Sequence, residues 1–169
     1  MDSSAFVALA LMCAPLVDPS TDRALVAVES GFNPHAIGVV GGALMRQPRN
    51  RAEALATARA LEADNRNFSV GLAQINLHSL QRLGLSLETA FDPCLNLAGM
   101  QAALTECLER TDPRQNDRQR SLRRALSCYY SGDFVTGFRH GYVRRVIDAM
   151  QAPAGRPASS PSLATLELP

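Results

Sequence analysis

The chain is a series of short helical segments separated by proline and glycine, and no stretch alternates apolar and polar residues as a half-buried strand would. Asp18 is suited to cap a helix whose first residue is Pro19, and Gly31 followed by Asn33-Pro34 ends that helix. The pattern predicts an all-α fold, or a mainly α fold with a small β excursion near Phe68. The predicted helices span residues 5–14, 19–30, 51–64, 95–108, 121–130 and 142–150, with a further one carrying Leu77, Leu80 and Leu83 and stopped by Gly84.

The remaining segments are expected to be loops, a connector and a tail. Residues 38–50 contain three glycines and Pro48 without apolar periodicity, which indicates a loop able to approach a ligand closely. Residues 109–120 are densely charged and are expected to form a connector. Since 169 residues have room for one domain, we expect a single domain over residues 1–150, followed at 151–169 by a disordered tail rich in proline, serine and alanine.

Charge and hydropathy exclude two classes of protein. The formal net charge of +1 lacks the basic excess typical of nucleic-acid-binding domains. The longest apolar stretch, Phe6 to Val17, contains Pro15 and is shorter than the ~20 residues that cross a bilayer, so no transmembrane segment is expected. Met1 to Leu16 lacks the basic start of an export signal and is interpreted as a mature first helix. Any such signal is expected to have preceded Met1.

The four cysteines predict two disulfides in an oxidising compartment. Their spacing does not favour zinc, because no Cys-x2-Cys pair occurs and the histidines are scattered, so no metal site is expected. If Cys94 and Cys107 share one helix, a rise of ~1.5 Å per residue holds them about 19 Å apart, too far for a disulfide, which needs Cα atoms within ~7 Å. Two connectivities remain: Cys13–Cys94 with Cys107–Cys128, or Cys13–Cys107 with Cys94–Cys128.

Glu29 is the residue whose position most suggests acid chemistry. It stands near the end of the predicted 19–30 helix, one turn after Leu25, so its carboxyl is expected beside apolar surface. Burial and the negative end of the helix dipole both raise a carboxyl pKa. Such a group can stay protonated near neutral pH and act as a general acid. Helix position alone favours a solvated surface glutamate, because glutamate is rarely buried.

Three segments, in order and at matching spacing, resemble the soluble lytic transglycosylase family, which is related in fold to goose-type lysozyme. Further segments are similar to its specialised branch from type IV secretion systems, and the resemblance covers about residues 5 to 148. The three segments are Glu29-Ser30-Gly31-Phe32-Asn33-Pro34, Gly71-Leu72-Ala73-Gln74-Ile75-Asn76, and Ala125 with Tyr129-Tyr130-Ser131-Gly132. The branch features are Cys13-Ala14-Pro15, Asp92 to Leu97, Tyr129 to Phe134, and Gly141-Tyr142-Val143.

The resemblance implies a lysozyme-like domain in which Glu29 is the catalytic acid. It implies cleavage of peptidoglycan between N-acetylmuramic acid and N-acetylglucosamine with formation of 1,6-anhydro ends, without a cofactor, in the periplasm. Components of a type IV secretion system are the further partners that it implies. Two residues depart from the family pattern: Ala73 replaces a methionine and Tyr130 an asparagine. The expected substrate-binding residues are Ser30, Gln74, Asn76, Tyr129 and Tyr130.

Each of these residues also has a structural interpretation. Gln74 and Asn76 suit sugar hydroxyl and N-acetyl groups, but equally suit turns and caps. Tyr129 can orient Glu29 with its hydroxyl or simply pack in the core, and Ser30 can bond to substrate or to backbone. Two other functions are compatible with the same residues: a lysozyme-like hydrolase using Glu29, and a non-catalytic glycan-binding or assembly module of a secretion apparatus.

Overall fold

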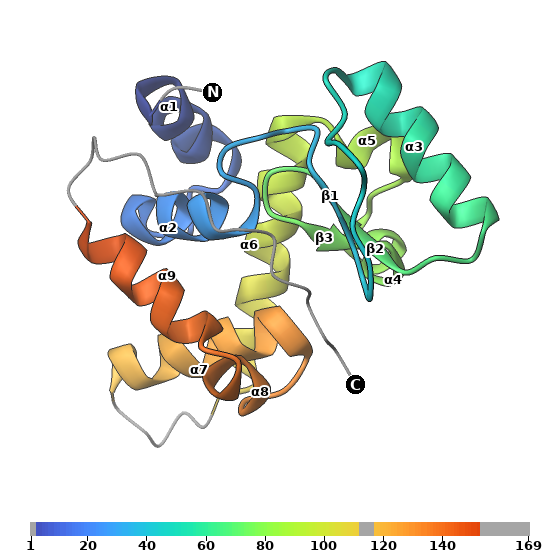
Figure 1. Cartoon of the computed structure of the whole chain (residues 1–169). Helices are drawn as coiled ribbons and strands as arrows, with labels where there is room; N and C mark the ends of the chain where they lie inside the picture. Colours follow the sequence, from blue (N-terminus) through green and yellow to red (C-terminus); the bar gives the residue numbers. More distant parts are fainter. Residues whose placement is uncertain (1–2, 112–116, 153–169) are drawn as a thin grey trace.

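A computed structural model describes residues 3–111 and 117–152, and in these residues the fold is mainly helical with one small sheet (Figure 1), as predicted. The part of the expected tail after residue 152 lies outside the described residues. The helices are α1 (Ser3–Cys13), α2 (Pro19–Glu29), α3 (Arg51–Ala63), α4 (Leu77–Leu80), the 3-10 turn η1 (Gln81–Leu83), α5 (Leu87–Ala90), α6 (Pro93–Glu109), α7 (Arg118–Ser131), α8 (Thr136–Arg139) and α9 (Tyr142–Gln151).

The sheet has three antiparallel strands in the order β1 (Ile37–Val39), β2 (Phe68–Val70) and β3 (Ile75–Asn76). Ile37 pairs with Val70, and Val70 also pairs with Ile75, so these three apolar residues lie side by side across the sheet. The prediction of a loop from residue 38 was wrong at its start, because Gly38 and Val39 belong to β1. Strands of two or three residues are too short to show an alternating pattern in the sequence.

Helix ends follow the local sequence signals closely. Asp18 accepts a hydrogen bond from the backbone N–H of Ser20 at 2.8 Å, and Pro19 is the first residue of α2. After α2 the chain turns through Gly31 and Phe32, both with positive φ, at 58° and 65°. The turn at Phe32 is a conformation that residues with a Cβ rarely adopt. The chain thus reverses immediately after Glu29 and enters β1.

Two short helices, α5 and α8, were not predicted, and α7 begins at Arg118 inside the expected connector. Single helical turns carry too few residues for a periodic signal in the sequence. Ser86 and Thr89 form a reciprocal capping box at α5. At the start of α7, Asp117 accepts from the N–H groups of Gln119 and Arg120.

Helix α6 runs through the middle of the molecule and is held at both ends by disulfides. Cys13–Cys94 joins α1 to its first turn with Cα atoms 5.1 Å apart, and Cys107–Cys128 joins its last turn to α7 at 5.7 Å. The structure therefore confirms the first of the two predicted connectivities. Between the bridges α6 buries Leu97, Met100 and Leu104 in the core.

In Figure 1, α6 lies between two groups of elements. The sheet, α3, α4 and α5 lie on one side, and α1, α2, α7, α8 and α9 lie on the other. The helix α2 packs extensively against α9, and α6 against α7. Within residues 3–111 and 117–152, every helix is too short or too polar to cross a bilayer.

Candidate active site

Glu29 is the last residue of α2 and lies where that helix approaches α9. Its side chain is half-buried, so solvent reaches part of it, while Leu25 and Val26 in the preceding turn are fully buried. Burial raises the pKa of Glu29 to about 7, against the lowering effects of a hydrogen bond from Tyr142 and the charge of Arg145. Near neutral pH the carboxyl therefore exists in both protonation states. Such a pKa suits a group that first donates a proton and then accepts one.

Tyr142 is the group that orients this carboxyl. It is the first residue of α9, is 2% exposed, and its hydroxyl donates a hydrogen bond to Glu29 Oε1. Burial, together with the nearby Glu29 carboxylate, raises the pKa of Tyr142 well above its usual value, so the hydroxyl keeps its proton and remains a donor. In the sequence, Tyr142 belongs only to a segment typical of the type IV secretion branch, and it was not among the expected site residues.

The two predicted tyrosines of α7 lie near Glu29 but make other hydrogen bonds. Tyr129 donates to the backbone oxygen of Ala73 at 2.7 Å, and the hydroxyl that donates to Glu29 is that of Tyr142. Burial raises the pKa of Tyr129, and the carboxylate of Glu29 adds to that effect, which places the two side chains within electrostatic reach. Tyr130 stacks on the ring of Tyr142, with centroids 4.5 Å apart and planes 20° apart. Tyr129 thus links α7 to the turn before β3, and Tyr130 supports Tyr142.

Gln74 and Asn76 make contacts within the protein, in the turn and capping roles that the sequence allowed as an alternative to sugar binding. Gln74 has a positive φ of 48°, and its amide nitrogen donates to the backbone oxygens of Ala36 at 3.1 Å and Gly71 at 3.0 Å. A Cβ on Gly38 would lie 2.7 Å from the side-chain oxygen of Gln74, so this close approach needs glycine. Asn76 caps α4 by accepting from the N–H of His78 at 3.1 Å. Both residues shape the segment between β2 and α4.

Ser30 likewise bonds to backbone, since its hydroxyl donates to the oxygen of Val26 at 3.2 Å. Its side chain remains half-buried. Contact of Ser30, Gln74, Asn76, Tyr129 and Tyr130 with a substrate therefore stays a prediction.

Asn96 is a structural residue of the site that sequence reasoning did not single out. It is fully buried, accepts from the N–H of Ala73 at 2.8 Å, and donates to the oxygens of Val70 at 3.1 Å and Ala90 at 2.7 Å. Its amide nitrogen would lie 2.3 Å from a Cβ at Gly71, where φ is +81°. One α6 side chain thus fixes the turn that carries Gln74. A polar residue among the apolar positions of α6 was the available signal.

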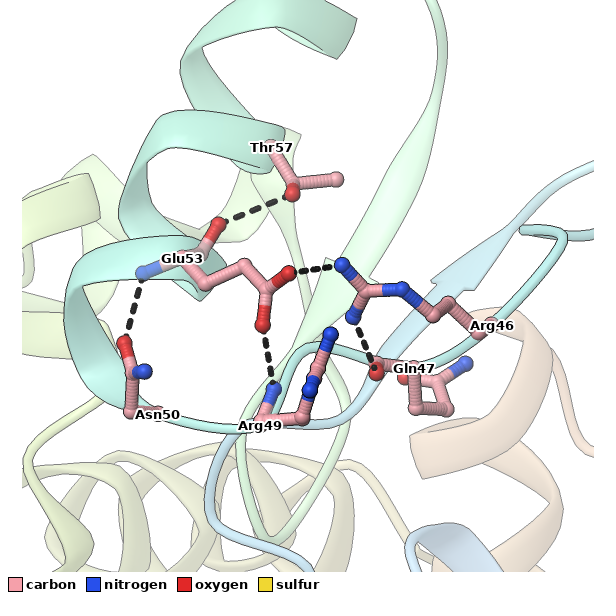
Figure 2. Close-up of polar contacts among 6 residues, drawn as sticks. All are labelled: Arg46, Gln47, Arg49, Asn50, Glu53 and Thr57. Atoms are coloured by element: carbon pink, nitrogen blue, oxygen red, sulfur yellow. Dashed lines mark hydrogen bonds and ion pairs between the residues drawn. The ribbon is translucent and has the colours of Figure 1, made fainter.

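The loop from residue 40 to residue 50 is fastened at its far end to α3 (Figure 2). Glu53 forms an ion pair with Arg46 and accepts from the N–H of Arg49 at 2.8 Å, while Asn50 accepts from the N–H of Glu53 at 2.9 Å. The amide of Gln47 pairs with the backbone of Ile37 through both its oxygen, at 2.8 Å, and its nitrogen, at 2.9 Å. Gln47 therefore covers the free edge of β1, which follows the Glu29 turn.

A hollow of about 570 Å³ lies elsewhere, between α3, α4 and α5. Its lining includes Arg59, His78 and Glu88 and none of the predicted site residues. The hollow is therefore separate from the predicted site residues.

Asp22 is a second buried acid, on the same helix and two turns before Glu29. It is 1% exposed, and neither carboxyl oxygen has a hydrogen-bond partner among the residues that the structure describes. Burial, with a smaller contribution from the charge of Asp18, raises its pKa to about 7. Because both oxygens are sealed from solvent, Asp22 cannot touch a substrate or activate bulk water. Glu29 is the accessible one of the two acids.

Comparison with known proteins assigns most of the chain to a protein family. The family model described as the transglycosylase SLT domain matches residues 7–147. The type IV secretion system protein virB1 of Brucella abortus is 47% identical over 148 residues, covering 84% of this chain and 62% of that protein. Protein virB1 of Agrobacterium fabrum is 41% identical over 141 residues, covering 82% and 56%. Protein virB1 of Rhizobium radiobacter is 36% identical over 154 residues, covering 90% and 63%.

The chain thus spans less than two thirds of the length of these curated relatives. No solved structure matches it.

Proposed function

This chain belongs to the transglycosylase SLT domain family, and from that premise we propose that it is a lytic transglycosylase of peptidoglycan. It cleaves the β-1,4 bond between N-acetylmuramic acid and N-acetylglucosamine and leaves 1,6-anhydromuramic ends. The observation that carries the proposal is the state of Glu29: a partly buried residue whose carboxyl has a pKa of about 7 and accepts a hydrogen bond from the hydroxyl of Tyr142. That combination suits an acid that must also act as a base.

In the proposed reaction Glu29 first donates its proton to the bridging oxygen, and the bond from that oxygen to the muramic C1 breaks. The acetamido group of the same sugar stabilises the cationic C1 that results. The Glu29 carboxylate then takes the proton of the muramic C6 hydroxyl, whose oxygen bonds to C1 and closes the anhydro ring. Glu29 gives one proton to the bridging oxygen and regains one from the C6 hydroxyl, so it ends the cycle protonated.

The location of Asp22 rules out the other buried acid of α2 as a second catalytic carboxylate. A glycosidase that uses water commonly has a second carboxylate close to the bond, as base or nucleophile. Asp22 precedes Glu29 by two helical turns, about 10 Å along the axis, and its oxygens are sealed in the core. It cannot serve as that second group, whereas a single acid suffices for the anhydro reaction.

We further propose that the enzyme works in the periplasm and opens the cell wall locally for a type IV secretion system, whose components would be its partners. The names of the relatives supply the secretion context. The two disulfides suit an oxidising compartment. The catalytic domain of this proposal is residues 1–150, and the tail from 151 onward lies outside it.

The test is mass spectrometry of the fragments released from purified insoluble peptidoglycan, with the Glu29→Gln chain as control. Fragments ending in anhydromuramic acid, lighter by one water than reducing ends, are expected from the unchanged chain alone. Reducing ends only would make the protein a hydrolase. Binding without any Glu29-dependent fragments would make it a non-catalytic glycan-binding module.

A further inference from the structure

A cluster of three side chains borders Glu29 on the side of α9. Arg145 lies one turn after Tyr142 on α9, with its guanidinium carbon 5.8 Å from the centre of the Tyr142 ring. It donates to the backbone oxygen of His140 at 3.1 Å, and the ring nitrogen Nδ1 of His140 lies 3.2 Å from the hydroxyl of Tyr130. Arg145 and His140 are exposed, and Tyr130 is half-buried. We call these three residues the rim cluster.

Arg145 has no ion-pair partner within residues 3–111 and 117–152. Its neighbour Arg144, on the same helix and equally exposed, lies 3.8 Å from Asp148. The position of Arg145 is nevertheless defined, because the Tyr142 ring and the His140 carbonyl both contact its guanidinium. A guanidinium held in place without a carboxylate is prepared to bind one, since less side-chain freedom is lost on binding.

The position of Arg145 is also unfavourable for acid catalysis by Glu29. Its charge lowers the pKa of Glu29 and of Tyr130, so it lies within electrostatic reach of both groups. A cation beside a general acid favours loss of the proton that the acid must deliver. An anion bound at Arg145 would cancel that effect at the moment the substrate is in place.

We propose that Arg145, supported by His140 and Tyr130, binds a carboxylate carried by the muramic residue of the glycan strand next to Glu29. This inference rests on the proposed function, because it names a substrate group for the same site. Peptidoglycan offers such a carboxylate in two forms. A strand that bears peptides carries carboxylates on the peptide stems, and a strand without peptides exposes the lactyl carboxylate of muramic acid itself.

Binding measurements test the proposal without requiring cleavage. Soluble glycan strands would be titrated into the full chain carrying Glu29→Gln, alone and combined with Arg145→Gln, Arg145→Lys or Arg144→Gln. Three strand preparations are needed: strands with peptides, strands stripped of peptides by an amidase, and stripped strands whose carboxyls have been converted to amides. Circular dichroism of each variant would verify that the helical fold is intact.

We expect Arg145→Gln to weaken binding about tenfold, the order of a charge-assisted hydrogen bond, on at least one of the two charged preparations. Arg145→Lys should recover part of this loss, while Arg144→Gln should stay within about twofold of its parent. On amidated strands Arg145→Gln should have no effect. A loss confined to strands with peptides would identify the stem carboxylates, and a loss confined to stripped strands the lactyl carboxylate.

Equal binding of Arg145→Gln and its parent on both charged preparations would overturn the proposal, and so would an equal loss on amidated strands. The proposed function fails separately, if the unchanged chain releases no anhydro fragments. The two failures are therefore distinguishable.

The pH profile provides a second readout that a purely structural role would not change. In the active chain, Arg145→Gln should move the alkaline limb of kcat/KM to higher pH, because a cation that lowers the pKa of Glu29 is removed. The tyrosines that interact with Glu29 remain in this variant: Tyr142, Tyr129 and Tyr130. An unchanged or acid-shifted alkaline limb would contradict the placement of Arg145 beside Glu29, on which the proposal rests.

Discussion

The first and last turns of α2 each bury an acid, and the two acids differ in what surrounds them. Burial raises the pKa of both Asp22 and Glu29 to about 7. Asp22 is sealed and lacks a hydrogen-bond partner among the described residues, whereas Glu29 is partly accessible and receives the hydroxyl of Tyr142. A raised pKa alone therefore does not mark an active site. Access and an orienting donor distinguish the acid that can work from the acid that is only buried.

Conservative amides at the two positions give the largest contrast. Glu29→Gln should lower the rate of release from dyed cell walls by about 10² to 10⁴-fold, since the amide keeps the shape but cannot transfer a proton. Asp22→Asn should stay within about twofold of the unchanged chain. A comparable loss in both variants would remove the distinction between the two acids.

Stability against pH sharpens the comparison, because both acids should destabilise the fold when they ionise. Their folded pKa values of about 7 exceed the unfolded values of 3.8 and 4.5. The contribution of these two acids to stability should therefore be greatest below about pH 4, fall as the pH rises to about 7, and level off above it. For Asp22 the total loss should be on the order of 2–4 kcal/mol, and it should be smaller for Glu29, which is partly exposed.

Urea unfolding of the unchanged chain, Asp22→Asn and Glu29→Gln at pH 5 and pH 8 measures this loss. Each amide should reduce the difference in unfolding free energy between the two pH values, Asp22→Asn more strongly. An Asp22→Asn chain with the full pH dependence would show that Asp22 ionises freely in the fold.

Tyr142→Phe should lower activity less than Glu29→Gln does. The change removes only the hydroxyl that donates to Glu29. Loss of the hydroxyl should lower kcat about tenfold, the order of a hydrogen bond to a charged group. Because that bond lowers the pKa of Glu29, its loss should also move the alkaline limb of the pH profile upward. Tyr142→Phe keeps the ring that stacks on Tyr130, so the unchanged chain is the reference. A kcat and a pH profile identical to those of the unchanged chain would mean that the hydroxyl of Tyr142 does not orient the acid.

The sequence predicted the parts of the fold and site that depend on local signals. The ends of α2 follow from Asp18, Pro19 and Gly31, and helix geometry reduced the disulfides to two connectivities, of which the structure confirms one. Glu29 was found by its motif, and its raised pKa agrees with the burial expected from Leu25. Its catalytic role stays a prediction.

Contacts between distant segments were not predictable in this way. Tyr142 follows Glu29 by more than a hundred residues, and nothing local indicates that its hydroxyl meets the acid. The sequence left Gln74 and Asn76 with either sugar contacts or structural roles. In the fold Gln74 donates to backbone oxygens, while Asn76 donates to the side chain of Asn67 and accepts from the N–H of His78. Asp22 gave no signal, because an acid in the first turn of a helix is usually a favourable surface residue. Asp22 is buried because of the way α2 packs against other helices, and the sequence of α2 alone does not predict that packing.

The disulfides join the first cysteine to the second and the third to the fourth. A chain that enters an oxidising compartment with its N-terminus first presents Cys94 to Cys13 before Cys107 has arrived. Cys107 then meets no unpaired thiol until Cys128 follows. Oxidation in order of arrival therefore yields the native pairing directly, and the chain needs no disulfide exchange to reach its final connectivity.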